Sequence, residues 1–146
     1  MYNKILVSYD GSDGSTECLK TGSVFAKIFN AKLTAIWVGG YKPYYHETKA
    51  EIDEERLSVE NFAKNLQHNI EELKSKESID IDFVYVIGNP AKEIISYAKR
   101  NNFDLIIIGH KGHSGLWESL GHVAEKVSEN AHCNVLIVRK KQNVKN

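Results

Sequence analysis

The residues of this chain that are best suited to bind a ligand lie in one stretch, residues 109–123, which reads GHKGHSGLWESLGHV. It follows the apolar run 105–108 and leads into a predicted helix that ends near Ala131. Glycines allow positive φ angles and close approach of the backbone, and the start of a helix offers unpaired N–H groups to an anion. Such parts build the phosphate sites of α/β proteins. The stretch therefore predicts an anion-binding loop, with an ordinary turn as the alternative.

A second polar group, Asp10, follows the apolar residues 5–7. In a doubly wound sheet the ligand crevice lies at the carboxyl ends of the strands, where the strand order reverses. If the first and fourth strands are neighbours, Asp10 and Gly109 face each other across that crevice. The Asp10 carboxylate could then accept hydrogen bonds from a ribose hydroxyl, as an acidic residue does in dinucleotide sites. The alternative is that Asp10 only helps Ser12 to cap the following helix.

The familiar motifs for nucleotide hydrolysis and covalent catalysis are absent from the sequence. There is no G-x-x-x-x-G-K-S/T, and no G-x-G-x-x-G follows a predicted strand. Residues 112–116 resemble the nucleophile elbow G-x-S-x-G, but Leu116 stands in place of the last glycine. His113 and Ser114 are neighbours in a loop, and neighbours of this kind rarely point at each other. We therefore predict no catalytic residues.

Three histidines in the glycine-rich stretch, His110, His113 and His122, raise the question of a metal site. Imidazole is a common metal ligand. The H-x-x-H spacing is not fixed by a helix here, however, and no carboxylate stands close by to complete a ligand set. We interpret the histidines as polar loop residues or as donors to a phosphate, and predict no metal site.

The periodicity of the apolar residues predicts the elements that would position these groups. Short apolar or alternating runs predict five strands, at residues 5–7, 31–38, 79–85, 105–108 and 133–138. Four helices are predicted between them: one from the cap Ser12 to Asn30, a long one whose apolar stripe includes Ile52, Phe62 and Leu73, one opened by Asn89 and Pro90, and one ending near Ala131. Because crossovers are right-handed, this alternation predicts an α/β fold with a five-stranded, parallel, doubly wound sheet and helices on both faces.

Composition predicts one domain and limits its partners. The chain has 146 residues, and 19 Lys and Arg balance 19 Asp and Glu, so the basic face that a nucleic acid needs is not expected. No apolar run approaches the ~18 residues of a membrane-spanning helix, and the N-terminus lacks signal-peptide organisation. Cys18 and Cys133 have no metal-type or redox-type spacing, which favours thiols in a reducing cytoplasm. We expect a single domain over residues 1–141 and a frayed tail over 142–146.

Four segments together resemble the universal stress protein family: residues 5–12 (ILVSYDGS), 88–90 (GNP), 104–109 (DLIIIG) and 133–138 (CNVLIV). The resemblance runs from about residue 3 to residue 140. It implies the adenine nucleotide alpha hydrolase-like sheet of strand order 3-2-1-4-5, which places Asp10 opposite Gly109. Members typically dimerise, often by pairing their last strands, so the resemblance also implies a homodimer through the strand that contains Val135 and Val138.

One branch of this family carries G-x2-G-x9-G-S/T after the fourth strand and binds ATP or another adenine nucleotide. The resemblance implies that Asp10 contacts the ribose and adenine, that the Val38 backbone reads the adenine edge, and that Ile108 lies beside the base. The remaining cofactor-binding positions that it implies are Tyr9, Gly109, Gly112, Gly121, His122 and Val123.

The glycine motif departs from the family pattern in two ways. Eight residues separate Gly112 from Gly121 where the pattern has nine, and His122 replaces the serine or threonine. The lost hydroxyl removes one donor, worth roughly 1 kcal/mol, although a protonated His122 could donate instead. Tyr9 also stands where nucleotide-binding relatives often have proline or a small residue.

These departures leave alternatives open. The leading expectation is a cytoplasmic, homodimeric regulator or sensor in stress response that binds ATP or another adenine nucleotide, with or without Mg²⁺. A second branch of the family lacks the motif and does not bind ATP, so the alternative is a nucleotide-free dimeric interaction module of the same fold. A third option is a slow ATPase that uses a bound Mg²⁺ and a water molecule.

Overall fold

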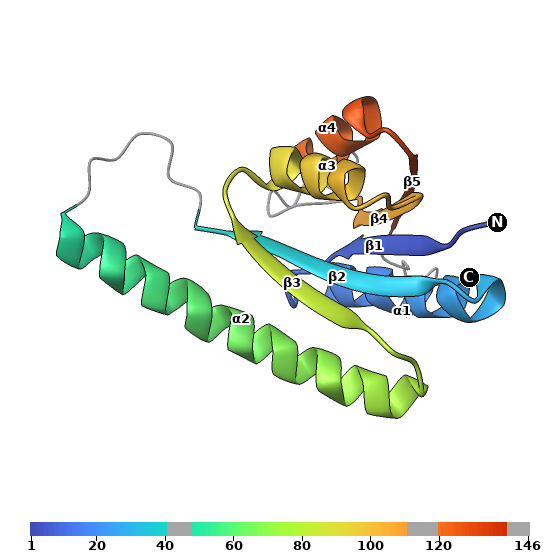
Figure 1. The fold of residues 1–146 in the computed structure, drawn as a ribbon, viewed down its shortest axis with the longest axis horizontal. Helices are drawn as coiled ribbons and strands as arrows, with labels where there is room; N and C mark the ends of the chain where they lie inside the picture. Colours follow the sequence, from blue (N-terminus) through green and yellow to red (C-terminus); the bar gives the residue numbers. More distant parts are fainter. Residues whose placement is uncertain (41–47, 111–119, 140–146) are drawn as a thin grey trace, which may run out of the picture.

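The sheet has the five parallel strands and the strand order that the sequence predicts. The computed structural model describes residues 1–40, 48–110 and 120–139. Its strands pair in parallel in the order β3-β2-β1-β4-β5 (Figure 1), which confirms the doubly wound arrangement. The strand bounds are β1 Lys4–Ser8, β2 Lys32–Gly39, β3 Asp82–Ile87, β4 Leu105–Gly109 and β5 Asn134–Val138. The helix bounds are α1 Asp13–Phe29, α2 Lys49–Glu77, α3 Pro90–Arg100 and α4 His122–Asn130.

Helices cover both faces of the sheet because successive side chains of a strand point to opposite faces. On β1, Ile5 and Val7 pack into a core with α1 and α2, whereas Leu6 packs into a second core with α3 and α4. Figure 1 shows α3 and α4 together on one side and α1 and α2 on the other. The two central strands, β1 and β4, are therefore buried on both faces, which explains why their sequences are continuous apolar runs.

The helix ends follow the capping residues that the sequence predicts. The Ser12 side chain caps α1 by accepting a hydrogen bond from Ser15 N, and Asn30 ends the helix in the left-handed conformation at φ 53°. Asn89 caps α3 through a bond from Lys92 N, and Pro90 is the first helical residue. These local signals fix where each helix enters and leaves the sheet, so they also fix the residues at the carboxyl ends of the strands.

Helix α1 packs closely against the sheet at Gly22. A Cβ atom placed on Gly22 would lie 2.8 Å from Val7 Cγ2 and 3.0 Å from Leu33 Cδ1. Both neighbours are buried side chains of β1 and β2. The missing side chain therefore allows close packing of the helix, which begins beside the end of β1.

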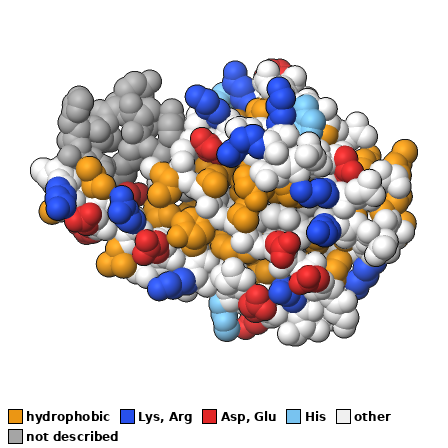
Figure 2. All heavy atoms as spheres, viewed as in Figure 1, with side chains coloured by type: hydrophobic (Ala, Val, Ile, Leu, Met, Phe, Trp, Pro, Cys, Tyr) orange, Lys and Arg blue, Asp and Glu red, His pale blue; other side chains and the backbone are white. Residues whose placement is uncertain are grey.

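The edge of the sheet at β3 differs from the prediction. The alternation predicts a strand over residues 79–85, but β3 begins at Asp82, and Ile81 is buried just before it. Tyr85 and Ile87 are 42% and 54% exposed, because β3 is an edge strand and α2 covers only part of it. Phe62 of the predicted α2 stripe is likewise exposed. Figure 2 shows hydrophobic side chains gathered over β3, between α2 and α3.

No helix in the described ranges is long and apolar enough to cross a membrane. The predicted frayed tail, residues 142–146, lies outside the described residues.

Candidate functional site

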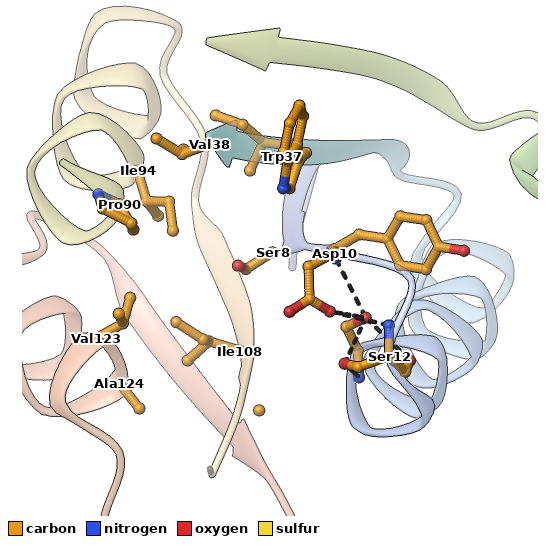
Figure 3. Close-up of a pocket in the computed structure, with 14 residues that line it drawn as sticks. Ser8, Asp10, Ser12, Trp37, Val38, Pro90, Ile94, Ile108, Val123 and Ala124 are labelled. Atoms are coloured by element: carbon orange, nitrogen blue, oxygen red, sulfur yellow. Dashed lines mark hydrogen bonds between the residues drawn. The ribbon is translucent and has the colours of Figure 1, made fainter. Parts of the chain in front are cut away.

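A pocket of about 210 Å³ lies at the carboxyl ends of β1, β2 and β4, where the order of the strands reverses. Helices α3 and α4 close it with residues near their N-terminal ends (Figure 3). Pockets that enclose a drug-sized ligand measure roughly 300–1,000 Å³. The described walls therefore enclose less space than a whole drug-sized ligand fills.

One side of the pocket is polar and is organised by Asp10. Asp10 Oδ1 accepts a hydrogen bond from Ser15 Oγ at 2.8 Å and another from Ser12 N at 3.0 Å, and Asp10 N donates to Ser15 Oγ at 3.2 Å. Ser12 supplies the helix cap, so Asp10 supports the start of α1 without being the cap itself. Figure 3 shows the Asp10 carboxylate at the edge of the pocket, with one oxygen on the serine side and the other toward the cavity.

The other side of the pocket is apolar and comes from four elements. Figure 3 shows side chains converging from β2, α3, β4 and α4 onto one space. The apolar residues that line it are Ile36, Val38, Pro90, Ile94, Ile108, Val123 and Ala124. Aliphatic side chains on opposing walls suit a flat, weakly polar ring, because burying such a ring removes apolar surface from water.

The first turn of α4 offers hydrogen-bond donors beside this apolar wall. Its N-cap is Gly121, and no side chain caps the helix. The helix N-terminus also carries a partial positive charge from the aligned peptide dipoles. Gly121 N donates to His110 O at 2.7 Å, and His110 N donates to Val138 O at 2.8 Å. These bonds join the start of α4 to the end of β4 and to β5.

The pocket includes most of the predicted site residues but not all of them. Six of the predicted cofactor-binding residues line it: Tyr9, Asp10, Val38, Ile108, Gly109 and Val123. Gly121 and His122 do not line it, and the His122 side chain is exposed. Gly112 lies outside the described residues. Tyr9 is only 4% exposed and packs in the core with Leu66, so little of its side chain is available to a ligand.

Four polar or aromatic pocket residues are missing from the predicted site: Ser8, Ser12, Ser15 and Trp37. The sequence predicts Ser12 only as a helix cap. Ser15 has a detectable signal, because a hydroxyl in the first turn of a helix can reach back to an acidic residue just before the cap. Trp37 shares one face of the predicted strand with Leu33 and Ala35, alternating with Thr34 and Ile36, which predicts an apolar environment for it. Its place in the pocket depends on residues distant in the sequence.

Metal ligands and reactive thiols play no part in the described pocket. Within residues 1–40, 48–110 and 120–139, no group of three His, Cys, Asp or Glu side chains could hold a metal ion. His113 lies outside these ranges. Burial, together with the negative charges of Asp10 and Glu17, raises the pKa of the Cys18 thiol to about 12. Cys18 is therefore neutral at ordinary pH and behaves as a small apolar core residue.

Comparison with known proteins gives consistent matches over nearly the whole chain. The model of the universal stress protein family matches residues 1–139. Universal stress protein YxiE of Bacillus subtilis is 35% identical over 153 residues, which cover 95% of this chain and 100% of that protein. The structure of universal stress protein UspA from Lactobacillus plantarum superposes with a TM-score of 0.83 at 25% identity, covering 94% of this chain and 98% of that one.

Two more distant structures share the fold and hold nucleotides. One is a universal stress protein in complex with cAMP, with a TM-score of 0.70 at 22% identity; it covers 96% of this chain and 99% of that one. The other is a universal stress family protein from Arabidopsis thaliana with AMP bound, with a TM-score of 0.71 at 14% identity; it covers 97% of this chain and 94% of that one.

Proposed function

Because this chain belongs to the universal stress protein family, we propose that it binds an adenine nucleotide in the pocket at the carboxyl ends of β1, β2 and β4. The observation that carries the proposal is the combination of three chemical environments in this pocket. A carboxylate held by two serines stands on one side, an apolar slot follows, and a helix N-terminus without a side-chain cap stands beside the slot. These three environments suit the ribose, the base and the phosphates of a nucleotide, respectively.

Each part of the nucleotide has a corresponding group in the pocket. Adenine lies between Val38 and Ile108, where its ring is removed from water. The ribose hydroxyls donate to the Asp10 carboxylate. The phosphates extend toward the first turn of α4, whose backbone N–H groups can donate hydrogen bonds to an anion. The helix dipole alone stabilises a negative charge there by about 0.3–1 kcal/mol. Any Mg²⁺ enters with the phosphates, because Asp10 is the single carboxylate among the described pocket residues.

The nucleotides named for the two distant relatives support an adenine nucleotide as the ligand class. One structure contains cAMP and the other AMP. They differ in how the phosphate is attached and share adenosine, which is the part that the described walls fit. We therefore assign the base and sugar to the described pocket and leave ATP and AMP as ligands to be compared.

We propose that the protein acts as a regulator or sensor in stress response. The sequence carries none of the familiar motifs for covalent catalysis or nucleotide hydrolysis, so binding itself is the proposed activity. A ligand shifts a conformational or partner equilibrium only by its different affinity for the two states. Cys18 and Cys133 are free thiols, which fits the cytoplasm as the site of action.

A homodimer through β5 is the proposed assembly. β5 is an edge strand with four consecutive apolar residues, Val135 to Val138, each partly buried. An apolar edge of this kind favours pairing with another chain unless something covers it.

The proposed function is tested by nucleotide binding with a charge-removal variant. Titration calorimetry with ATP and AMP is expected to give binding that Asp10→Asn weakens at least several-fold. Asp13→Asn, which removes an exposed carboxylate three residues away and outside the pocket, is the matched control and keeps the wild-type affinity. If the wild type binds neither nucleotide, and heat-denatured protein releases no AMP, ADP or ATP, the proposal is wrong.

The nucleotide-free interaction module makes a different prediction for a repaired loop. Inserting one residue between 112 and 121 together with His122→Ser restores the family spacing and the hydroxyl. Under the proposed function this variant binds ATP more tightly than the wild type. Under the alternative it creates binding that the wild type lacks.

A further inference from the structure

Trp37 is held in one orientation at the mouth of the pocket. Its ring lies 4.7 Å from the Phe62 ring of α2 and 6.4 Å from the Tyr85 ring of β3, measured between centroids. Gly39 makes this position possible, because a Cβ atom there would lie 2.4 Å from Trp37 Cζ2. The absence of a side chain at position 39 and the two aromatic neighbours therefore determine where the indole nitrogen points.

The indole nitrogen faces the polar side of the pocket. Figure 3 shows the nitrogen end of Trp37 directed toward the region of Ser8 and Asp10. Residues of the described part of the chain form no hydrogen bond to this N–H, and the atom is not fully buried. An indole N–H can only donate, whereas an ionised carboxylate can only accept. Trp37 and Asp10 thus present one donor and one acceptor to the same cavity.

A hydroxyl group is the ligand that satisfies such a pair, because it donates and accepts at the same time. We propose that Trp37 is a specificity-determining residue: its Nε1–H donates to a ribose hydroxyl oxygen while the ribose diol donates to Asp10. This inference rests on the proposed nucleotide site and assigns to it a preference for ribose over a sugar without 2′- and 3′-hydroxyls. Gly39 and Phe62 act as positioning residues that hold the indole.

The test compares ATP with 2′,3′-dideoxy-ATP on Trp37→Phe. Phenylalanine keeps an aromatic ring against Phe62 and removes the N–H donor together with the second ring of the indole; the loss of that ring is shared by ATP and dideoxy-ATP. Wild type is expected to prefer ATP by about tenfold or more. Trp37→Phe is expected to lose about fivefold more affinity for ATP than for dideoxy-ATP, the effect of one hydrogen bond. Gly39→Ala, which displaces the indole, is expected to reproduce this pattern.

Other outcomes separate the two proposals. If Trp37→Phe binds ATP as tightly as the wild type, or loses equal affinity for ATP and dideoxy-ATP, the assignment of Trp37 is wrong even though the nucleotide site stands. If wild type binds neither ligand, the nucleotide site itself is wrong.

A second measurement does not depend on the folding of a Trp37 variant. The chain has two tryptophans, so Trp117→Phe assigns the indole N–H resonances in a ¹⁵N-correlation spectrum. ATP is expected to shift the Trp37 resonance downfield and dideoxy-ATP to shift it less. Equal shifts with both ligands overturn the inference.

Discussion

Ser15 Oγ donates a hydrogen bond to Asp10 Oδ1 over 2.8 Å, and the same oxygen accepts from Asp10 N at 3.2 Å. The hydroxyl therefore fixes both the carboxylate and the backbone of Asp10, five residues earlier in the chain. A carboxylate held in this way needs less reorganisation when it meets a ligand, because its rotamer is already set.

Ser15→Ala is expected to weaken ATP binding about fivefold, corresponding to one net hydrogen bond of roughly 1 kcal/mol. Titration calorimetry measures the change. Thr21→Ala is the matched control, because the Thr21 hydroxyl donates to Glu17 O within the same helix and does not line the pocket. Equal affinities of Ser15→Ala and wild type would show that Asp10 does not need this hydroxyl.

Alanine substitutions at two glycines of α1 are expected to change the free energy of unfolding in opposite directions. Gly22→Ala introduces a Cβ 2.8 Å from Val7 Cγ2, and overpacking of this kind costs about 1–3 kcal/mol. Gly14→Ala meets no atom within 4 Å and gains up to about 1 kcal/mol from helix propensity. Urea unfolding monitored by circular dichroism gives both free energies of unfolding. A stabilised Gly22→Ala variant would contradict the close approach of α1 to the sheet.

The buried thiol of Cys18 makes stability fall at alkaline pH. Its folded pKa is raised from 9.0 to about 12 by burial and by the charges of Asp10 and Glu17. Between these values the unfolded chain loses a proton that the folded chain keeps, so the contribution is complete below pH 9 and is lost toward pH 12. At pH 10 the loss from this group is about 1 kcal/mol.

Cys18→Ala removes the pH-dependent contribution of this thiol, whereas Cys133 and all lysines and tyrosines are present in both the wild type and the variant. The difference in unfolding free energy between wild type and Cys18→Ala is therefore expected to shrink by about 1 kcal/mol from pH 8 to pH 10 in urea titrations. A difference that stays constant over this range would mean that the Cys18 thiol ionises equally in both states.

The proposed pairing of β5 strands predicts twice the chain mass of 16.5 kDa in solution. Light scattering after size-exclusion chromatography measures this mass at micromolar concentration. Val138→Lys, at the end of β5, is expected to favour the monomer, because a two-fold interface repeats the new charge on both subunits. A thermal melt by circular dichroism checks that the variant folds. A wild-type monomer at these concentrations would rule out the dimer.

Local signals predict the frame of the fold well. Ser12, Asn30 and the Asn89–Pro90 pair act within one turn of their own position, so the sequence around each one is enough to place a helix end. The apolar runs of β1 and β4 identify the central strands for the same reason, since burial on both faces leaves no alternation. The placement of Asp10 and Gly109 in one pocket follows from this frame.

Properties set by distant contacts are harder to predict. Tyr85 alternates like a core residue, yet it is 42% exposed because β3 is an edge that α2 covers incompletely. Trp37 lines the pocket because Gly39 leaves room for its ring and Phe62, on another helix, packs against it. Neither relationship has a periodicity that a single sequence displays. The same reason explains the buried ring of Tyr9, which packs with Leu66.

The hydrogen bond from Gly121 N to His110 O joins two points of the chain that are separated by the ten residues 111–120. In a ring closed in this way, the entropy of closure grows only with the logarithm of the ring length, by about 0.6 kcal/mol per doubling. One residue more or fewer among ten then changes the stability by roughly 0.1 kcal/mol. A change in the number of residues between His110 and Gly121 is therefore expected to leave the free energy of unfolding almost unchanged.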